Sequence, residues 1–120
     1  MFVVQEDVWL RTPVEPEGHS HGYQSYPCLF QPEAVEPGSV EAINERRNDW
    51  MDVLLKAGIS TRPATHAVHM LSFYREKYGI RSEDFPNAYA ANHCSISLPL
   101  FHGMTTEEQD YVINVVTGSF

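Results

Sequence analysis

An amphipathic segment at residues 39–57 constrains the fold of this chain more than any other feature. The turn-forming run Pro37-Gly38-Ser39 precedes it and supplies an N-cap, and Gly58 stands where helices commonly end. Its apolar side chains fall 7, 8, 11 and 12 residues after the first and form one stripe: Ile43, Trp50, Met51, Leu54 and Leu55. The pattern predicts a long helix with one buried face.

Short extended segments and further helices flank this helix. We expect extended segments at residues 3–10, 23–30, 59–62 and 94–98, and helices at residues 65–78, 87–93 and 105–117. Residues 65–78 can form one helix or a helical turn followed by a short helix. Asn87 is the expected cap of the second of these helices. Thr105 and Glu108 fit a capping box at the start of the last helix, whose expected apolar face is Tyr111, Val112, Val115 and Val116. A few strands interleaved with about four helices predict an α+β domain.

Composition and charge exclude several classes of function. The chain has 120 residues, which is one domain, with 8 basic and 16 acidic side chains and a net charge of −8. This charge argues against nucleic acid and anionic membrane surfaces as partners. No apolar run approaches the roughly 20 residues of a membrane span, and the N-terminus lacks the basic region of a secretory signal.

The two cysteines and the serines also bear on the class of protein. Cys28 and Cys94 form no Cys-x-x-Cys pair, and we interpret them as reduced, buried thiols of a cytoplasmic protein, with a single disulfide between them as the open alternative. Neither cysteine has the context of a nucleophile, and no serine lies in a Gly-x-Ser-x-Gly elbow. These observations argue against a hydrolase.

The richest chemistry lies in residues 58–74, where an arginine, two histidines and a tyrosine follow the long helix. Two further phrases come after it: Phe85-Pro86-Asn87-Ala88, then Ser97-Leu98-Pro99-Leu100 leading into Met104-Thr105-Thr106-Glu107-Glu108. In this order, the phrases resemble the C-terminal end of the DegT/DnrJ/StrS family of pyridoxal-phosphate-dependent sugar aminotransferases, over residues 10–116.

The resemblance implies a fold and an activity. It implies that residues 1–120 form the small C-terminal domain of a fold-type I enzyme, a small antiparallel sheet packed with about four helices, without the large cofactor-binding domain. In the family, pyridoxal phosphate (PLP) is bound to a lysine of the large domain, and an amino donor and a nucleotide-linked keto-sugar are the substrates. The only lysines here, Lys56 and Lys77, do not lie in the family's lysine motif. We therefore expect no cofactor on this chain alone, no catalytic residue and no transaminase activity.

The expected substrate-binding residues are Arg62, His69, His66 and Tyr74. A guanidinium suits a carboxylate or a phosphate, and Pro63 stiffens the turn that presents it. The resemblance implies that this turn faces the cleft between the two domains. The alternative is a surface arginine paired with an acid.

The resemblance to the family extends to His69 and is weaker at His66 and Tyr74. His69 matches a family histidine that precedes Pro-x-Tyr, which is here Ser72-Phe73-Tyr74, and His66 stands where relatives often have Tyr or Phe. The alternative is a pair of structural histidines. A metal site is a further alternative, but no spacing matches a zinc signature.

Three hypotheses for the whole chain stay open. The first is a C-terminal fragment of the aminotransferase that contributes one wall of the substrate cleft. The others are a stand-alone binding or regulatory module with the same fold, and a histidine-cluster metal protein. Because the absence of a large domain would uncover an apolar face, we also expect a homo-oligomer.

Overall fold

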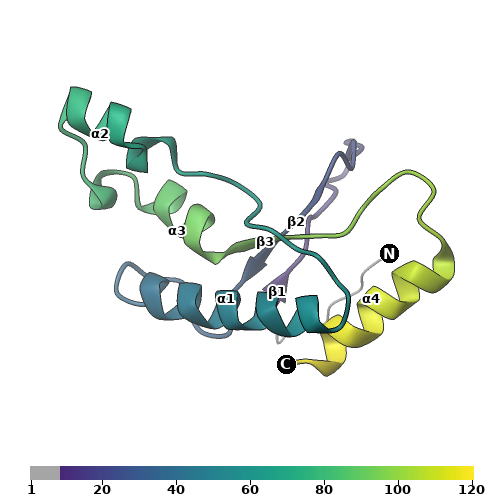
Figure 1. The fold of residues 1–120 in the computed structure, drawn as a ribbon. Helices are drawn as coiled ribbons and strands as arrows, with labels where there is room; N and C mark the ends of the chain where they lie inside the picture. Colours follow the sequence, from purple (N-terminus) through teal and green to yellow (C-terminus); the bar gives the residue numbers. More distant parts are fainter. Residues whose placement is uncertain (1–8) are drawn as a thin grey trace.

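A three-stranded antiparallel sheet is the centre of the fold (Figure 1). The computed structural model describes residues 9–120. The strand order is β1-β2-β3, with β1 at Leu10–Arg11, β2 at Tyr26–Phe30 and β3 at Ser95–Leu98. The helices are α1 (Val40–Lys56), α2 (Ser72–Tyr78), α3 (Pro86–Cys94) and α4 (Thr106–Gly118), with short 3-10 turns η1 (Val68–Met70) and η2 (Ser82–Asp84). The α+β prediction is confirmed.

One face of the sheet is apolar because its register puts large side chains opposite one another. Leu10 pairs with Phe30, Cys28 with Ile96, and Tyr26 with Leu98. Side chains directly opposite in an antiparallel pair project from the same face. All six are buried.

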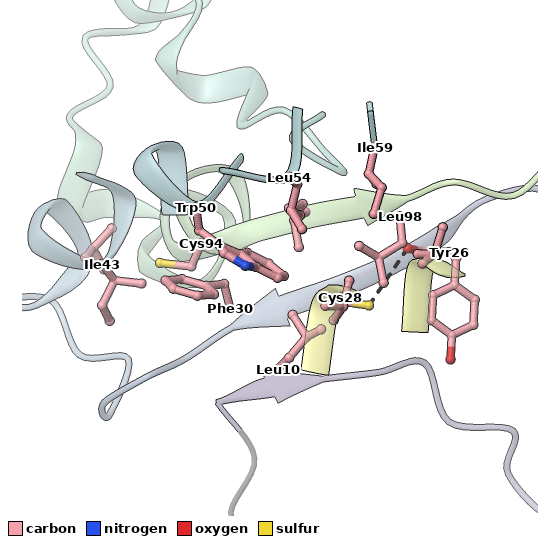
Figure 2. Packing of buried hydrophobic residues seen from close by; sticks show 14 residues of the cluster. Leu10, Tyr26, Cys28, Phe30, Ile43, Trp50, Leu54, Ile59, Cys94 and Leu98 are labelled. Atoms are coloured by element: carbon pink, nitrogen blue, oxygen red, sulfur yellow. Dashed lines mark hydrogen bonds between the residues drawn. The ribbon is translucent and has the colours of Figure 1, made fainter. Parts of the chain in front are cut away.

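Helices α1 and α4 close the core over this face. Ile43, Trp50 and Leu54 of α1 belong to the same buried cluster as the sheet residues (Figure 2). Val112 and Val116 of α4 belong to it as well. The two helices are also tied by hydrogen bonds. Trp50 Nε1 donates to Ser119 Oγ at 2.8 Å, and the Tyr111 hydroxyl donates to the carbonyl oxygen of Ala57 at 2.7 Å.

The ends of the long helix follow the sequence prediction in most respects. Gly58 has a φ of +83°, a left-handed conformation that glycine adopts without strain, and it follows Ala57, the C-cap of α1. Ser39 precedes the helix, but its hydroxyl donates to the carbonyl oxygen of Ala34 and makes no cap bond to the helix. Leu55 is 61% exposed, so the buried stripe is narrower than predicted.

Three predicted elements differ from the structure. Residues 59–62 form no strand, because this segment makes only one isolated bridge, from Arg62 to Ser97. The strand expected from residue 23 begins at Tyr26, since Tyr23 has a φ of +44° that takes it out of extended geometry. Helix α3 begins at Pro86 with Phe85 as its N-cap, so Asn87 is not the cap. Residues 3–8 of the expected N-terminal segment lie outside the described residues.

Helix α2 stands apart from the core. It has no buried residue, and Figure 1 shows it at the far end of the molecule from α4. None of the helices within residues 9–120 has the length and apolarity that crossing a membrane requires. Cys28 and Cys94 are both free and buried, as predicted.

Candidate functional site

A polar groove lies where the segment after α1 runs beside the free edge of β3. Its volume is about 470 Å³, and it is lined by residues 24–25, 60–64 and 97–101. Two hydrogen bonds hold the segment against the strand. Ser97 N–H donates to the carbonyl oxygen of Arg62 at 2.7 Å, and Ala64 N–H donates to Ser95 Oγ at 3.1 Å. The loop is thus fixed to the sheet by its main chain.

A single cation characterises this groove. Among the described residues that line it, Arg62 alone carries a charge, and its side chain is exposed. Arg62 takes part in no ion pair within residues 9–120. In a chain with a net charge of −8, an unpaired guanidinium in a groove is available to a ligand anion.

Neutral hydrogen-bonding groups surround this cation. Gln24, Ser25 and Ser97 line the groove with Arg62, and so does Thr61, whose hydroxyl oxygen is buried without a hydrogen-bond partner in the described part of the chain. Phe101 adds an exposed aromatic ring. The groove can therefore bind a ligand that combines an anion with hydroxyl groups.

His69 lies outside the polar groove. It is 7% exposed, its Nε2 donates to the carbonyl oxygen of Ser82 at 3.2 Å, and its ring centroid lies 5.2 Å from that of Phe85. These contacts join η1 to the turn before α3. The geometry is that of a side chain which holds two segments together.

His66 and Tyr74 also lie away from the groove lining. His66 is exposed on the segment between Arg62 and η1. Tyr74 lies on α2, where its ring packs against Phe73 and Tyr78. The structure therefore does not bring the four sequence-predicted residues into one pocket, and substrate contact by His66, His69 and Tyr74 stays a prediction.

Metal-ligating side chains are dispersed in residues 9–120. No three of the histidine, cysteine, aspartate and glutamate side chains described there come close enough together to hold an ion. A smaller hollow of about 280 Å³ includes Glu36, Glu41 and Glu83 in its lining. There the Tyr89 hydroxyl donates to Glu41 Oε1 at 2.8 Å, and this bond lowers the pKa of Glu41 below its ordinary value.

A second, apolar groove adjoins the polar one. Its volume is about 550 Å³, and residues 58–60, Pro99, Phe101, Met104 and side chains of α4 line it. Ser60, Pro99 and Phe101 line both grooves, so the two are neighbours. One surface therefore offers an apolar half beside an Arg62-containing half.

Comparison with known proteins identifies the family. The model of the DegT/DnrJ/EryC1/StrS aminotransferase family matches residues 10–117. The chain belongs to this family. The match includes all strands and helices of the described structure up to residue 117.

Individual relatives extend well beyond the matched region. Uncharacterized protein MJ1066 of Methanocaldococcus jannaschii is 29% identical over 107 residues, which is 89% of this chain and 26% of that protein. The spore coat polysaccharide biosynthesis protein SpsC of Bacillus subtilis is 37% identical over 49 residues, which is 41% of this chain and 13% of that protein. The matched segments thus span about a quarter or less of the length of these two relatives.

Solved structures agree on the fold. Spr1654 of Streptococcus pneumoniae, named a sugar aminotransferase, matches in its PLP form with a TM-score of 0.71 and 23% identity, over 89% of this chain and 25% of that one. Its pyridoxamine phosphate (PMP) form matches with a TM-score of 0.70 over 92% of this chain and 28% of that one. The small sheet and its helices therefore have the same fold as part of Spr1654.

Sequence reasoning missed most of the groove lining. It singled out Arg62, but it did not connect this residue with Gln24, Ser25 or Ser97. The alternation of side chains along the two strands could have indicated these residues. Because Tyr26 and Leu98 face the core, the neighbouring side chains of Ser25 and Ser97 lie away from it. That signal needs the register between strands, which the sequence alone does not provide.

Proposed function

We propose that this chain is the C-terminal, small-domain part of a PLP-dependent aminotransferase that acts on nucleotide-linked keto-sugars. In this proposal the polar groove is one wall of the substrate cleft, and the enzyme is cytoplasmic, as the two buried free thiols favour. The observation that carries the proposal is Arg62, the single cation of an otherwise neutral groove. Membership of the family supports the amino-transfer chemistry.

The groove residues have distinct roles in substrate binding. The Arg62 guanidinium offers a planar set of donors that pairs with two oxygens of a phosphate or a carboxylate at once. Gln24, Ser25 and Ser97 offer neutral donors and acceptors of the kind that sugar hydroxyls need. The exposed ring of Phe101 offers an apolar surface to a flat base or a sugar face.

The lysines of the chain do not fit a cofactor site in this groove. PLP, when bound in such enzymes, supplies an electron sink and requires a lysine amine beside its aldehyde. Lys56 is the last residue of α1, and the Lys77 ammonium lies 5.3 Å from the ring centroids of Phe73 and Tyr78 on α2. Neither lines the groove. We therefore propose that the cofactor lysine lies in another part of the protein, and that the 120-residue chain alone is inactive.

Amide chemical-shift mapping on the ¹⁵N-labelled chain tests the groove. We expect UDP-glucose, used as a probe, to shift the amides of the non-proline residues in 24–25, 60–64 and 97–101, and the Arg62→Ala variant to lose these shifts. Arg75→Ala is the matched control, because Arg75 is an exposed arginine on α2 whose loss changes the net charge equally. Shifts confined to the surroundings of His66, His69 and Tyr74 would contradict the assignment of the groove.

The affinity separates a cleft wall from a complete binding module. One wall of a divided site supplies only part of the contacts, so we expect a Kd on the order of millimolar. A Kd on the order of micromolar would favour the stand-alone binding module.

Incubation with PLP and reduction with borohydride tests the proposed inactivity of the chain alone. A stoichiometric adduct on one lysine, seen by intact mass, would contradict it.

A further inference from the structure

Arg47 is a charged side chain inside the core. It lies in the middle of α1 and is 4% exposed. None of the ion pairs within residues 9–120 involves it, and burial lowers its pKa below the ordinary value. A buried guanidinium without a carboxylate partner costs free energy that an apolar side chain of similar size would not. The contacts of Arg47 show what this cation does.

The guanidinium binds the junction between α3 and β3. Its Nη1 donates to the carbonyl oxygens of Asn92 at 3.1 Å and of Ser95 at 2.8 Å. Its Nε and Nη2 donate to Asn48 Oδ1 at 3.2 and 2.9 Å. The forked group is therefore fixed by its own helix on one edge, and it holds two main-chain carbonyls with the other.

The two residues held in this way also hold the loop that presents Arg62. Ser95 Oγ accepts a hydrogen bond from Ala64 N–H at 3.1 Å, and Asn92 Oδ1 accepts one from Ala67 N–H at 3.0 Å. Their main chains bind Arg47 and their side chains bind the loop. A continuous series of hydrogen bonds thus joins the interior of α1 to the main chain just after Arg62.

We propose that Arg47 is a positioning residue for the Arg62 loop, so that loss of its guanidinium weakens ligand binding in a groove that it does not line. This rests on the proposed function of the groove as a substrate-binding wall. A lysine does not replace the arginine here, because an ammonium is a point donor that cannot span Asn48 and both carbonyls. The effect passes through the Ser95 and Asn92 side chains.

Two measurements on the full 120-residue chain test the proposal. The first is amide hydrogen exchange at Ala64 and Ala67, read relative to the amides of β2. The second is the Kd for UDP-glucose. We expect Arg47→Met to speed exchange at both alanines by about five- to tenfold relative to β2, the factor expected when a hydrogen bond is lost, and to raise Kd by about fivefold.

Asn44→Ala is the matched control. Asn44 Nδ2 donates to the carbonyl oxygen of His93 at 2.8 Å, so it binds the same end of α3. The His93 side chain, however, bonds to Tyr89 and Asn92 and makes no hydrogen bond to the loop. We expect unchanged relative exchange at Ala64 and an unchanged Kd in this variant. Ala67 is not a control position, because its acceptor Asn92 also contacts the His93 ring.

If Arg47→Met does not fold, Arg47→Lys takes its place, because it keeps the buried cation and loses the planar fork. A further variant tests the next bond in the series. Ser95→Ala keeps the carbonyl that Arg47 binds and removes only the acceptor for Ala64, so exchange at Ala64 and the Kd should both rise. Unchanged relative exchange in folded Arg47→Met, or in Ser95→Ala, would overturn the proposal. If the wild-type chain does not bind UDP-glucose, the proposed function fails, but the exchange rates still decide whether Arg47 positions the loop.

Discussion

At residue 62, the shape of the side chain should matter as well as its charge. Arg62→Lys keeps the cation but loses the planar fork that meets two anionic oxygens. We expect the Kd for UDP-glucose to rise about three- to tenfold in Arg62→Lys and at least about tenfold in Arg62→Ala. Titration calorimetry or NMR measures both. Equal affinity of the lysine variant and the wild type would mean that only the long-range charge acts.

Cys28 gives the chain a dependence on alkaline pH. Burial raises the pKa of its thiol to about 12. In the unfolded chain the thiol ionises near its usual pKa of about 8.5, while the folded chain keeps the proton. The stabilisation is therefore complete below that pH and is lost as the pH rises toward 12. We expect the free energy of unfolding to fall over this range.

Urea unfolding at pH 8 and pH 10 measures this effect. The Cys28→Ala variant is the comparison, and its free energy of unfolding should fall less between the two pH values. An equal fall in the variant and the wild type would assign the alkaline dependence to other groups. Alkylation by iodoacetamide at pH 8 should also be slow at Cys28 until the chain unfolds, because a buried thiol is both protonated and inaccessible.

Arg47 shows what a residue-level interpretation of the sequence overlooks. It lies on the same helix stripe as Ile43, Trp50 and Leu54, four residues after the first, and all four are buried. The predicted stripe includes apolar residues only, so it does not include Arg47. The helical spacing of Arg47 from Ile43 and Leu54 is the feature of the sequence that could have indicated its burial.

Helix α4 depends on its N-terminal cap. Thr105 Oγ1 accepts a hydrogen bond from Glu108 N–H at 3.1 Å, and Glu108 Oε2 accepts one from Thr105 N–H at 2.9 Å. We expect Thr105→Ala to lower the free energy of unfolding by about 1 kcal/mol, because an alanine leaves the first helical donors unsatisfied. Chemical denaturation measures the change.

The neighbouring threonine is the control for this prediction. Thr106 is the first residue of α4 and is exposed. Thr106→Ala should therefore change the free energy of unfolding by no more than about 0.5 kcal/mol. If both variants lost the same stability, the loss would come from helix propensity or the denatured state instead of from the cap.

The sequence predicts an element well when neighbouring residues determine it, and poorly when a distant segment does. The capping box of α4 and Gly58 after α1 are encoded within a few residues, and both appear as predicted. The strand expected at residues 59–62 was wrong because a strand exists only through a partner. Here the partner edge of β3 receives just one bridge before Pro63, which has no N–H to donate.

Several large apolar side chains on α2 and in the segments that flank it are exposed. Phe73 and Tyr78 are 62% and 61% exposed, and Leu71 and Phe85 are also exposed. Exposed apolar patches favour association, so we expect the isolated chain to form dimers or larger assemblies at about millimolar concentration. The double variant Phe73→Ser, Tyr78→Ser should be a monomer under the same conditions.

Light scattering across a concentration series measures this association. Val14→Ser is the matched control, because Val14 is a highly exposed apolar residue outside this surface, in the loop after β1. It should associate like the wild type. A wild-type chain that stays monomeric throughout the series would contradict the prediction. If the double variant still associates, the contact lies on another surface.

The candidate site is formed by segments that lie far apart in the sequence. Its lining comes from residues 24–25, 60–64 and 97–101, and of these segments only the middle one was predicted to bind substrate. The other two segments join it because β2 pairs with β3 and the loop runs beside β3. Such pairings are non-local, so a motif could identify Arg62 but could not predict its neighbours.

The bridge between Arg62 and Ser97 has a consequence for how this family member could change. The loop covers the outer edge of β3 through the carbonyl oxygen of residue 62, and every amino acid has that atom. The side chain that meets the ligand is a separate group. New ligand preferences could therefore arise by substitution at this one position without opening the sheet edge to unwanted strand addition.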